Sequence, residues 1–456
     1  MIQSSRIKVL NDAPERADGA YVLYWMQQSQ RAEFNPALEL AIEEANRLGL
    51  PTVVGFGVTA YPEANARHYD FMLRGLAEVQ ARLVERGVAF VIRRKAPNEL
   101  ALELSRQAAL VVCDRGYLKP QRAWREALAK TIDRRLIQVE GDVVVPVETA
   151  SPKHEFAART IRPKIQRLRE DYLVDLPATP VSVRADQLNL ASNVDLSDIA
   201  AVLVELKLDM SVGPVKRFVA GQAAARERLA QFLEDGLGRY SAERGIPEAA
   251  AGSHMSPYLH FGQISPVELA LAAREAKPGS EDLASYLEEL IVRRELAMNH
   301  VFYEPAYDDY RTLPEWARKT LVAHAADPRP HLYTREQFEA CETHDRYWNA
   351  AMREMRETGY MHNHMRMYWG KKILQWSRTP EEAWDVLLRI NNRWFLDGRD
   401  ANSFMNVGWI FGLHDRPWGP QPVFGTVRSM GPNTFKKFNA EAYVAAVDRL
   451  VEAERP

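Results

Sequence analysis

The sequence is poor in cysteine, with only Cys113 and Cys341 among its 456 residues. Two cysteines can build neither a disulfide framework nor a thiolate metal site, so we expect a cytoplasmic protein. No apolar run reaches the length that spans a bilayer, and the first residues, MIQSSRIKVLNDAPERADG, lack the apolar core of a signal peptide. We therefore expect no membrane partner.

The chain also lacks an excess of basic charge, since its formal net charge is -2. This excludes a protein coated in basic surface, but it leaves room for a local basic patch. One such patch lies between 346 and 378, where seven basic residues face only Glu354 and Glu357. A local excess is usually a solvated helix face, yet the ten tryptophans add flat surfaces for stacking on bases or on a ring cofactor.

A chain of this length exceeds the usual limit of a single core, so we expect two domains. Apolar strand patterns occur at 20–26, 51–57, 88–94, 109–114 and 135–140, and helical patterns occur between them near 36–48, 65–86, 97–107 and 119–132. This alternation predicts an α/β domain with a doubly wound parallel sheet, whose ligands sit beyond the strand C-termini. The sequence GFGVTA (55–60) lacks the third glycine of a dinucleotide fingerprint, which argues against a conventional NAD or ATP site.

The rest of the chain has a different character. Residues 151–174 predict a basic amphipathic helix that completes an N-terminal domain of residues 1–174. Residues 175–211 are proline-dotted and aperiodic, as is typical of a connector. Helical periodicity then predicts an all-α domain over 212–456, with helices at 216–238, 265–276, 281–300, 334–342, 346–358, 360–377, 380–396 and 438–453.

Several motifs in this second domain carry possible chemistry. The segment GSHMSPYLHFG, which starts at Gly252, offers small and hydroxyl residues with free backbone N–H groups, either as a phosphate cradle or as a plain helix N-cap. The segment RINNRWFLDGRDANSF, which starts at Arg389, holds two carboxylates around a glycine, either as an acid–base site or as a turn. Because His362 and His364 are two residues apart, they point in different directions on a helix, so we expect no metal site.

Trp369 and Trp376 are seven residues apart, which places them on one face of a helix about 10 Å apart along its axis. This spacing suits a pair of redox-active indoles beside cations, among them Lys371 and Lys372, that could hold phosphate. Two core residues would show the same spacing.

Five motifs in order resemble those of one family: GSHMSPYLHFG, EELIVRREL, MHNHMRMYWGKKILQW, NNRWFLDGRDAN and GWIFGLHDRPW. Together they resemble the photolyase/cryptochrome family. HDRPW, YWGKKILQW and AARTIRPKI (157–165) are similar to class II cyclobutane pyrimidine dimer photolyases. The resemblance implies the photolyase fold, an all-α domain that binds FAD, and light-driven electron transfer from reduced flavin to a thymine dimer.

The resemblance also implies the residues that hold FAD. They are Tyr240, Gly252, Ser253, His254, Met255, Ser256 and Asn363, with Arg366 paired to Asp397 beside the flavin ring and Asn391 facing flavin N5. A second antenna chromophore of deazaflavin or folate type is common in the family, but no motif here selects one.

The implied electron chain runs from Trp369, nearest the flavin, through Trp348 to Trp376 at the surface. The implied partner is UV-damaged DNA that contains cyclobutane pyrimidine dimers. Glu289 would hydrogen-bond the dimer bases, Met367 and Trp409 would pack against the flipped dimer, and Arg244 and Asp415 would form a pair beside the opened duplex. Arg428, Lys436 and Lys437 would contact the DNA backbone. Arg293 stands where many photolyases have a tryptophan, which weakens any expectation of stacking there.

The resemblance leaves alternatives open. A cryptochrome-type flavin photoreceptor would share the fold and FAD without lyase activity, often with a long signalling tail, and the end of this sequence soon after its last helical pattern favours repair. A (6-4) photolyase would have a histidine pair over the lesion, which the matching positions lack. A nucleic-acid-binding α/β protein without catalysis would use its Trp and Arg residues only structurally. We expect a monomeric DNA photolyase.

Overall fold

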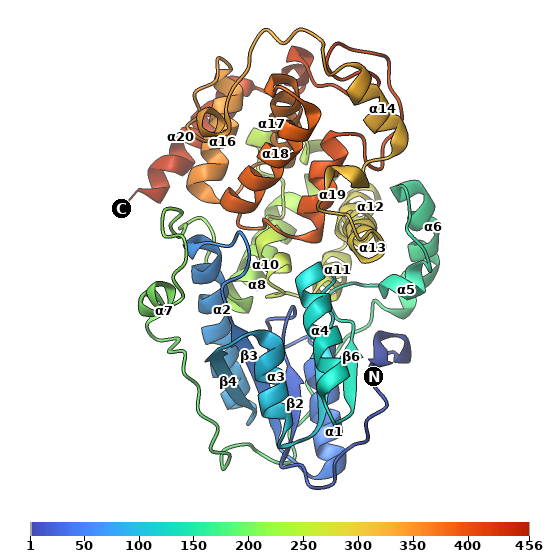
Figure 1. Cartoon of the computed structure of the whole chain (residues 1–456), viewed down its shortest axis with the longest axis vertical. Coiled ribbons are helices and arrows are strands. Elements are labelled where there is room, and N and C mark those ends of the chain that lie inside the picture. Colours follow the sequence, from blue (N-terminus) through green and yellow to red (C-terminus); the bar gives the residue numbers. More distant parts are fainter. Residues whose placement is uncertain (1, 456) are drawn as a thin grey trace.

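The computed structural model describes residues 2–455, apart from the side chains of Pro432 and Lys437. A sheet domain with its helices occupies one end of the molecule, and helices make up the other end (Figure 1). No helix within 2–455 is both long and apolar enough to cross a bilayer.

The N-terminal part contains a six-stranded sheet in the order β1-β6-β5-β2-β3-β4. Its strands are β1 (Ile7–Val9), β2 (Tyr21–Trp25), β3 (Thr52–Val58), β4 (Ala89–Arg94), β5 (Ala108–Asp114) and β6 (Leu136–Val139). All neighbours pair in parallel except β1, which runs antiparallel to β6 at the edge. The predicted doubly wound sheet is confirmed, and the antiparallel edge strand was not anticipated.

Helices cover both faces of this sheet. They are α1 (Pro36–Leu48), α2 (Ala66–Glu85), α3 (Pro97–Ser105) and α4 (Lys119–Thr131). Successive side chains of a strand point to opposite faces, so Val22 and Tyr24 pack in the core of α1 and α2 while Leu23 packs in the core of α3 and α4. Burial on both faces explains why these strands read as continuous apolar runs.

The middle of the chain connects the two parts. It contains α5 (Val147–Ala150), α6 (Ala158–Leu168) and α7 (Ile199–Glu205). The helix predicted over 151–174 is therefore shorter, because an irregular stretch precedes Ala158. The predicted connector lies against the edge of the sheet, where the Asn193 N–H donates to the Ile92 carbonyl oxygen at 3.1 Å.

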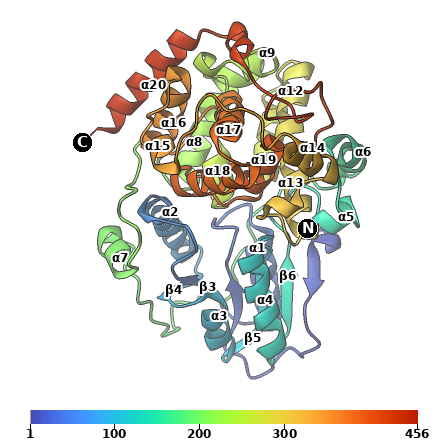
Figure 2. The same ribbon diagram turned by 45° about the horizontal axis from the view of Figure 1, so that its top comes forward.

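From Gln222 onward the described residues form helices and loops without a named strand. The helices are α8 (Gln222–Gln231), α9 (Tyr240–Glu243), α10 (Ser256–His260), α11 (Pro266–Glu275), α12 (Ser280–Leu287), α13 (Arg294–Tyr303), α14 (Glu315–Ala323), α15 (Arg335–Glu339), α16 (Arg346–Thr358), α17 (Asn363–Trp376), α18 (Pro380–Trp394), α19 (Ala401–Ile410) and α20 (Ala440–Glu454). α20 packs along α16 at the end far from the sheet (Figure 2). The predicted all-α half is confirmed.

Buried polar side chains tie the two parts together. Arg31 is fully buried and donates to the Gly262 carbonyl oxygen at 3.0 Å. On α13, Arg294 pairs with Asp142 at 2.9 Å, and Glu295 accepts the Val144 N–H at 2.6 Å. Since buried charges must be paired, these contacts fix α13 on the loop that follows β6.

Candidate functional site

A cavity of about 260 Å³ lies among the helices of the second half. Most residues that the sequence predicts for FAD line it: Tyr240, Gly252, Ser253, His254, Met255, Ser256, Asn363, Arg366 and Asp397, together with Glu289 and Arg244. The cavity thus brings together segments from α9, the loop before α10, the start of α17 and the turn after α18. Tyr286, Tyr360, Asn402 and Asn406 also line it, and no sequence signal pointed to them.

The loop before α10 contributes strained backbone to the cavity wall. His254 has φ +53°, in the left-handed region that non-glycine residues rarely adopt. Its ring lies 4.8 Å from the ring of Tyr360, and its Nδ1 is buried without a hydrogen-bond partner. Burial, reinforced by Arg217 and Arg228, lowers the pKa of His254 to about 3, so its ring is neutral at pH 7.

Arg366 and Asp397 form the predicted ion pair in the lining of the cavity. Nη2 of Arg366 donates to both carboxylate oxygens of Asp397, at 3.1 and 3.2 Å. Nε of Arg366 donates to the Met361 carbonyl oxygen, and the guanidinium carbon lies 3.8 Å from the ring centroid of Phe395. These contacts hold the guanidinium in one orientation.

Asn391 lies apart from the cavity lining. It is buried near the end of α18, where its amide donates to Asn392 Oδ1 at 3.1 Å. Asn392 Oδ1 also accepts the Arg399 N–H, so both asparagines brace the turn that presents Asp397.

Glu289 lies in a π-helical stretch, Glu288–Arg293, between α12 and α13. Such widened turns occur often at functional sites because they redirect side chains. Glu289 pairs with Arg244 at 2.9 Å, and both side chains are about one third exposed, at 33% and 39%. The predicted pair of Arg244 with Asp415 is wrong, because Asp415 instead accepts the indole N–H of Trp418 at 3.2 Å.

The three tryptophans of the predicted chain are all buried. Trp348 on α16 donates its Nε1–H to the Trp369 carbonyl oxygen at 3.0 Å, and its ring lies 5.9 Å from that of Trp376. Trp376 is only 3% exposed, so its predicted place at the surface is wrong. Tyr333 and His344 cover it, with ring centroids 5.7 and 5.0 Å away.

The cations beside the tryptophans do not line the cavity. Lys371 is buried and donates to the Ile410 carbonyl oxygen, and burial lowers its pKa to about 7. Lys372 lies 5.5 Å from the ring of Trp376. Neither is placed to hold phosphate in this cavity, contrary to the expectation from their spacing.

The residues predicted to contact DNA differ in exposure, and most of them do not line the cavity. Met367 and Trp409 are half-buried outside the lining, while Arg428 and Lys436 are exposed. The guanidinium carbons of Arg428 and Arg416 lie 5.0 and 5.1 Å from the ring of Trp418, which is 39% exposed. Sequence reasoning missed this Arg–Trp–Arg cluster, although Trp418 ends the HDRPW motif. The side chain of Lys437 lies outside the described residues.

The AARTIRPKI motif, on α6, contacts the π-helical stretch Glu288–Arg293. Arg162 on α6 donates from Nε and Nη2 to the two carboxylate oxygens of Glu288, at 2.9 and 2.7 Å. Arg293 pairs with the same carboxylate at 3.1 Å, which accounts for the unexpected arginine at this position. The π-helical stretch is therefore held in place by α6.

A second cavity, of about 140 Å³, lies beyond the C-terminal ends of β2 and β3. Met26, Gln27, Val58 and Trp124 are among its lining residues. Asp114, at the end of β5, is fully buried and accepts the N–H groups of Gln27 and Gln28 at 2.7 and 2.8 Å. The cavity lies at the edge of the sheet where a ligand is expected, beyond the strand C-termini.

The sequence predicts no metal site at His362 and His364, because the two are only two residues apart. His362 instead accepts the His364 N–H at the start of α17. The structure does bring together three other histidines, His154, His300 and His414, which are far apart in the sequence.

Comparisons with known proteins agree with this geometry. Residues 22–181 match the family model described as DNA photolyase. The chain is 44% identical to the deoxyribodipyrimidine photo-lyase of Methanothermobacter thermautotrophicus over 99% of this chain and all of that protein. Among solved structures, a bacterial class III photolyase from Agrobacterium tumefaciens is similar with a TM-score of 0.72 at 20% identity, covering 96% of this chain and 90% of that one. An archaeal photolyase from Sulfolobus tokodaii has a TM-score of 0.68 at 18% identity, covering 94% and 90%. The full-length relative, the family model and the cavity together show that this chain belongs to the DNA photolyase family.

Proposed function

We propose that this protein is a light-driven deoxyribodipyrimidine photo-lyase of class II, which splits cyclobutane pyrimidine dimers in DNA. The observation that carries the proposal is the cavity of about 260 Å³, whose lining includes the Arg366–Asp397 and Glu289–Arg244 pairs. We favour repair over a photoreceptor function, because a relative that matches over 99% of this chain is named as a deoxyribodipyrimidine photo-lyase.

The cavity suits FAD in its donor set. His254 Nδ1 is buried without a hydrogen-bond partner and belongs to a lining residue, so a polar ligand would satisfy it. Gly252, Ser253 and Ser256 would hold the phosphates with backbone N–H and hydroxyl groups. FAD, when bound in reduced form, supplies the electron that light drives into the dimer.

The Arg366–Asp397 ion pair would compensate electrostatically for changes of charge on the bound flavin ring. Asp397 neutralises Arg366 while the ring is uncharged, so the guanidinium is not left unpaired. When the ring gains negative charge, the guanidinium can strengthen its own contact with the ring. Asn391 lies outside the lining, and its bond to Asn392 would support the turn that presents Asp397 to the ring.

Trp369, Trp348 and Trp376 would carry electrons inward to oxidised flavin. The ring of Trp369 lies 6.2 Å from Phe395, which in turn contacts Arg366, so this end of the chain meets the cavity wall. At the other end Trp376 is buried, and Tyr333 would connect it to solvent. The Tyr333 hydroxyl lies 2.8 Å from His344 Nδ1, which can accept the proton that Tyr333 loses on oxidation.

The DNA would approach the side of Glu289. Glu289 would accept hydrogen bonds from the dimer bases once Arg244 turns to a phosphate, while Met367 and Trp409 pack on the extruded pair. Trp418, with Arg416 and Arg428 beside it, offers an exposed stacking surface with positive charge for the strand around the lesion. Lys436 would add a phosphate contact.

The second cavity would hold an antenna chromophore. The Sulfolobus tokodaii photolyase was crystallised with two FAD molecules, which implicated a novel light-harvesting cofactor in that protein. Here Gln27 Nε2 and Gln30 Oε1 belong to lining residues and are buried without partners, so the cavity offers one donor and one acceptor to a ring system such as a deazaflavin.

The test is a repair assay on an oligonucleotide that contains one thymine dimer. With blue light, the purified protein should restore the absorbance of separate thymines near 260 nm, and a dark control should not. Protein that shows flavin absorbance but no light-dependent repair would contradict the lyase, whereas colourless protein that takes up no added FAD would contradict the cofactor site.

A further inference from the structure

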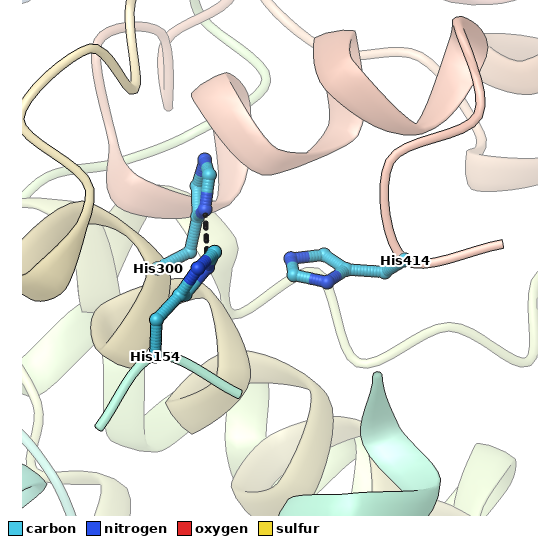
Figure 3. A group of neighbouring side chains, drawn as sticks. All are labelled: His154, His300 and His414. Carbon is cyan, nitrogen blue, oxygen red and sulfur yellow. Dashed lines mark hydrogen bonds between the residues drawn. The ribbon is translucent and has the colours of Figure 1, made fainter. Parts of the chain in front are cut away.

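Three histidines from separate parts of the chain meet outside the FAD cavity (Figure 3). His154 lies in the loop before α6, His300 on α13, and His414 just after α19. None of the three lines either of the two large cavities. Among residues 2–455 this is the one group of three or more His, Cys, Asp or Glu side chains whose possible ligand atoms come so close together.

The nitrogen atoms converge. One from each ring lies within 4.8 Å of the others, and His154 Nε2 is 3.0 Å from His300 Nδ1. Two imidazole nitrogens on one tetrahedral zinc ion are about 3.3 Å apart, because each Zn–N bond is about 2.05 Å. The His154–His300 pair is thus close to the spacing of bound ligands, and the ring of His414 would have to move inward by up to about 1.5 Å.

The hydrogen bond of His414 leaves its Nε2, the atom that faces the other two histidines (Figure 3), available to a metal ion. Its Nδ1 lies 2.8 Å from the Phe156 carbonyl oxygen, which can only accept, so Nδ1 carries the proton. Its Nε2 therefore has a lone pair, and this atom is buried without a hydrogen-bond partner. A backbone carbonyl that orients the second ring nitrogen in this way is the usual support of a metal-bound histidine.

The other two rings can supply lone pairs as well. If the Nε2–H of His300 faces the Thr312 hydroxyl, at 3.5 Å, then its Nδ1 has a lone pair. In the metal-free protein, His154 Nε2–H then donates to His300 Nδ1. If the His154 proton moves to Nδ1 of the same ring, both facing nitrogens have lone pairs and a metal can take the place of the hydrogen bond.

We propose that His154, His300 and His414 form a binding site for one divalent transition-metal ion of the zinc type. Three neutral imidazoles and no thiolate or carboxylate form a donor set that suits Zn²⁺, with water in the fourth position. Glu304 near His154 offsets the charge of Arg293 near His414.

The ion would be structural. It would join the loop that carries Asp415 and Trp418 to α13 and to the segment between β6 and α6. If the proposed function holds, this loop contacts DNA, so the metal would order a surface that the duplex must meet. Metal binding can be measured without DNA or light, and its failure is therefore distinct from failure of repair.

The experiment uses flavin-containing protein without a histidine tag, treated with a chelator and then titrated with Zn²⁺ in a calorimeter. We expect one equivalent per chain with a Kd below about 1 µM. His154→Gln and His414→Ala should each weaken binding at least tenfold, with flavin absorbance as the check of folding. Absence of a saturable equivalent, or affinity unchanged in both variants, would overturn the site.

A matched control is His331→Gln. His331 and His344 are exposed and stacked, with ring centroids 3.7 Å apart, and could take up zinc adventitiously. We expect the tight equivalent to survive this substitution, and its loss would place the ion at that surface pair and refute the proposal. X-ray absorption at the zinc edge of the unaltered protein should show three imidazole ligands, a readout that does not depend on whether variants fold.

Discussion

Glu288 and Glu289 are neighbours in sequence with different surroundings. Glu288 pairs with Arg162 and Arg293 and holds the π-helical stretch, whereas Glu289 lines the cavity and pairs with Arg244. A widened helical turn separates the directions of the two carboxylates, so one is structural and the other is available to a ligand. Substitution can therefore separate their roles.

Glu289→Gln should lower the light-dependent repair yield about tenfold while FAD remains bound. The substitution removes one charged hydrogen bond to the dimer, a contact of about 1.5 kcal/mol. Repair yield per absorbed photon measures the effect, and flavin absorbance after purification verifies the site. Glu288→Gln is the matched control: if it reduces repair as strongly without loss of stability, the assignment of Glu289 is wrong.

Trp369→Phe should abolish photoreduction of oxidised flavin under blue light, because phenylalanine cannot be oxidised at this step. Repair by enzyme reduced with dithionite should persist, since that reaction does not use the chain. Tyr333→Phe should leave the first transfer intact and make charge recombination faster, because Trp376 then has no outer donor. Transient absorption measures both, and normal photoreduction in the Trp369 variant would refute the path.

At the level of elements, the turn between α18 and α19 positions Asp397 for Arg366. The turn is compact because Gly398 lies against backbone: a Cβ there would come within 2.8 Å of the Asn391 carbonyl oxygen and 2.9 Å of that of Phe395. Backbone atoms cannot swing aside as side-chain ends can. The glycine between the two carboxylates is thus needed for the fold of the turn, whatever the acids do.

Gly398→Ala should destabilise the protein by about 1–3 kcal/mol, since the added methyl forces the turn apart. Asp397 would shift with the turn, so FAD affinity should fall as well. Urea denaturation and fluorescence of released flavin measure the two effects. Gly238→Ala is the control, because a Cβ there meets no heavy atom within 4 Å, and an equal loss in both variants would contradict the steric argument.

At the scale of the whole molecule, histidines buried without charge couple stability to pH. Burial is the main reason that the pKa of His254 falls to about 3 and that of His362 to about 4. Both values lie below the pKa of about 6.5 in the unfolded chain. Below pH 6.5 the unfolded chain binds more protons than the folded protein, so stability decreases as pH falls.

Between pH 7.5 and 5.5 the free energy of unfolding should therefore decrease by about 2–3 kcal/mol from these two rings. Urea denaturation at several pH values measures it. His254→Gln should reduce the pH-dependent loss of stability by about 1.4 kcal/mol over this interval, because this ring then no longer contributes. A steeper or unchanged dependence in that variant would show that His254 is not the group involved.

Much of this molecule can be read from the sequence. Strands that are buried on both faces must be apolar throughout, and helices near the sheet must alternate with them, so residues 20–140 predict their own elements to within a few positions. Caps and glycines mark the helix ends, as Thr379 and Pro380 do for α18. The matched motifs identified most residues around the larger cavity, because the side chains of these motifs form its walls.

The packing of distant segments decided the rest. Burial of Trp376 depends on Tyr333 and His344, which come from another stretch of chain, so helical spacing alone could not reveal it. Likewise, Arg244 pairs with Glu289 rather than with Asp415. His154, His300 and His414 lie together because α13 packs on the loop after β6. Local sequence specifies what each element is, whereas contacts between elements depend on the geometry of a core that no single segment encodes.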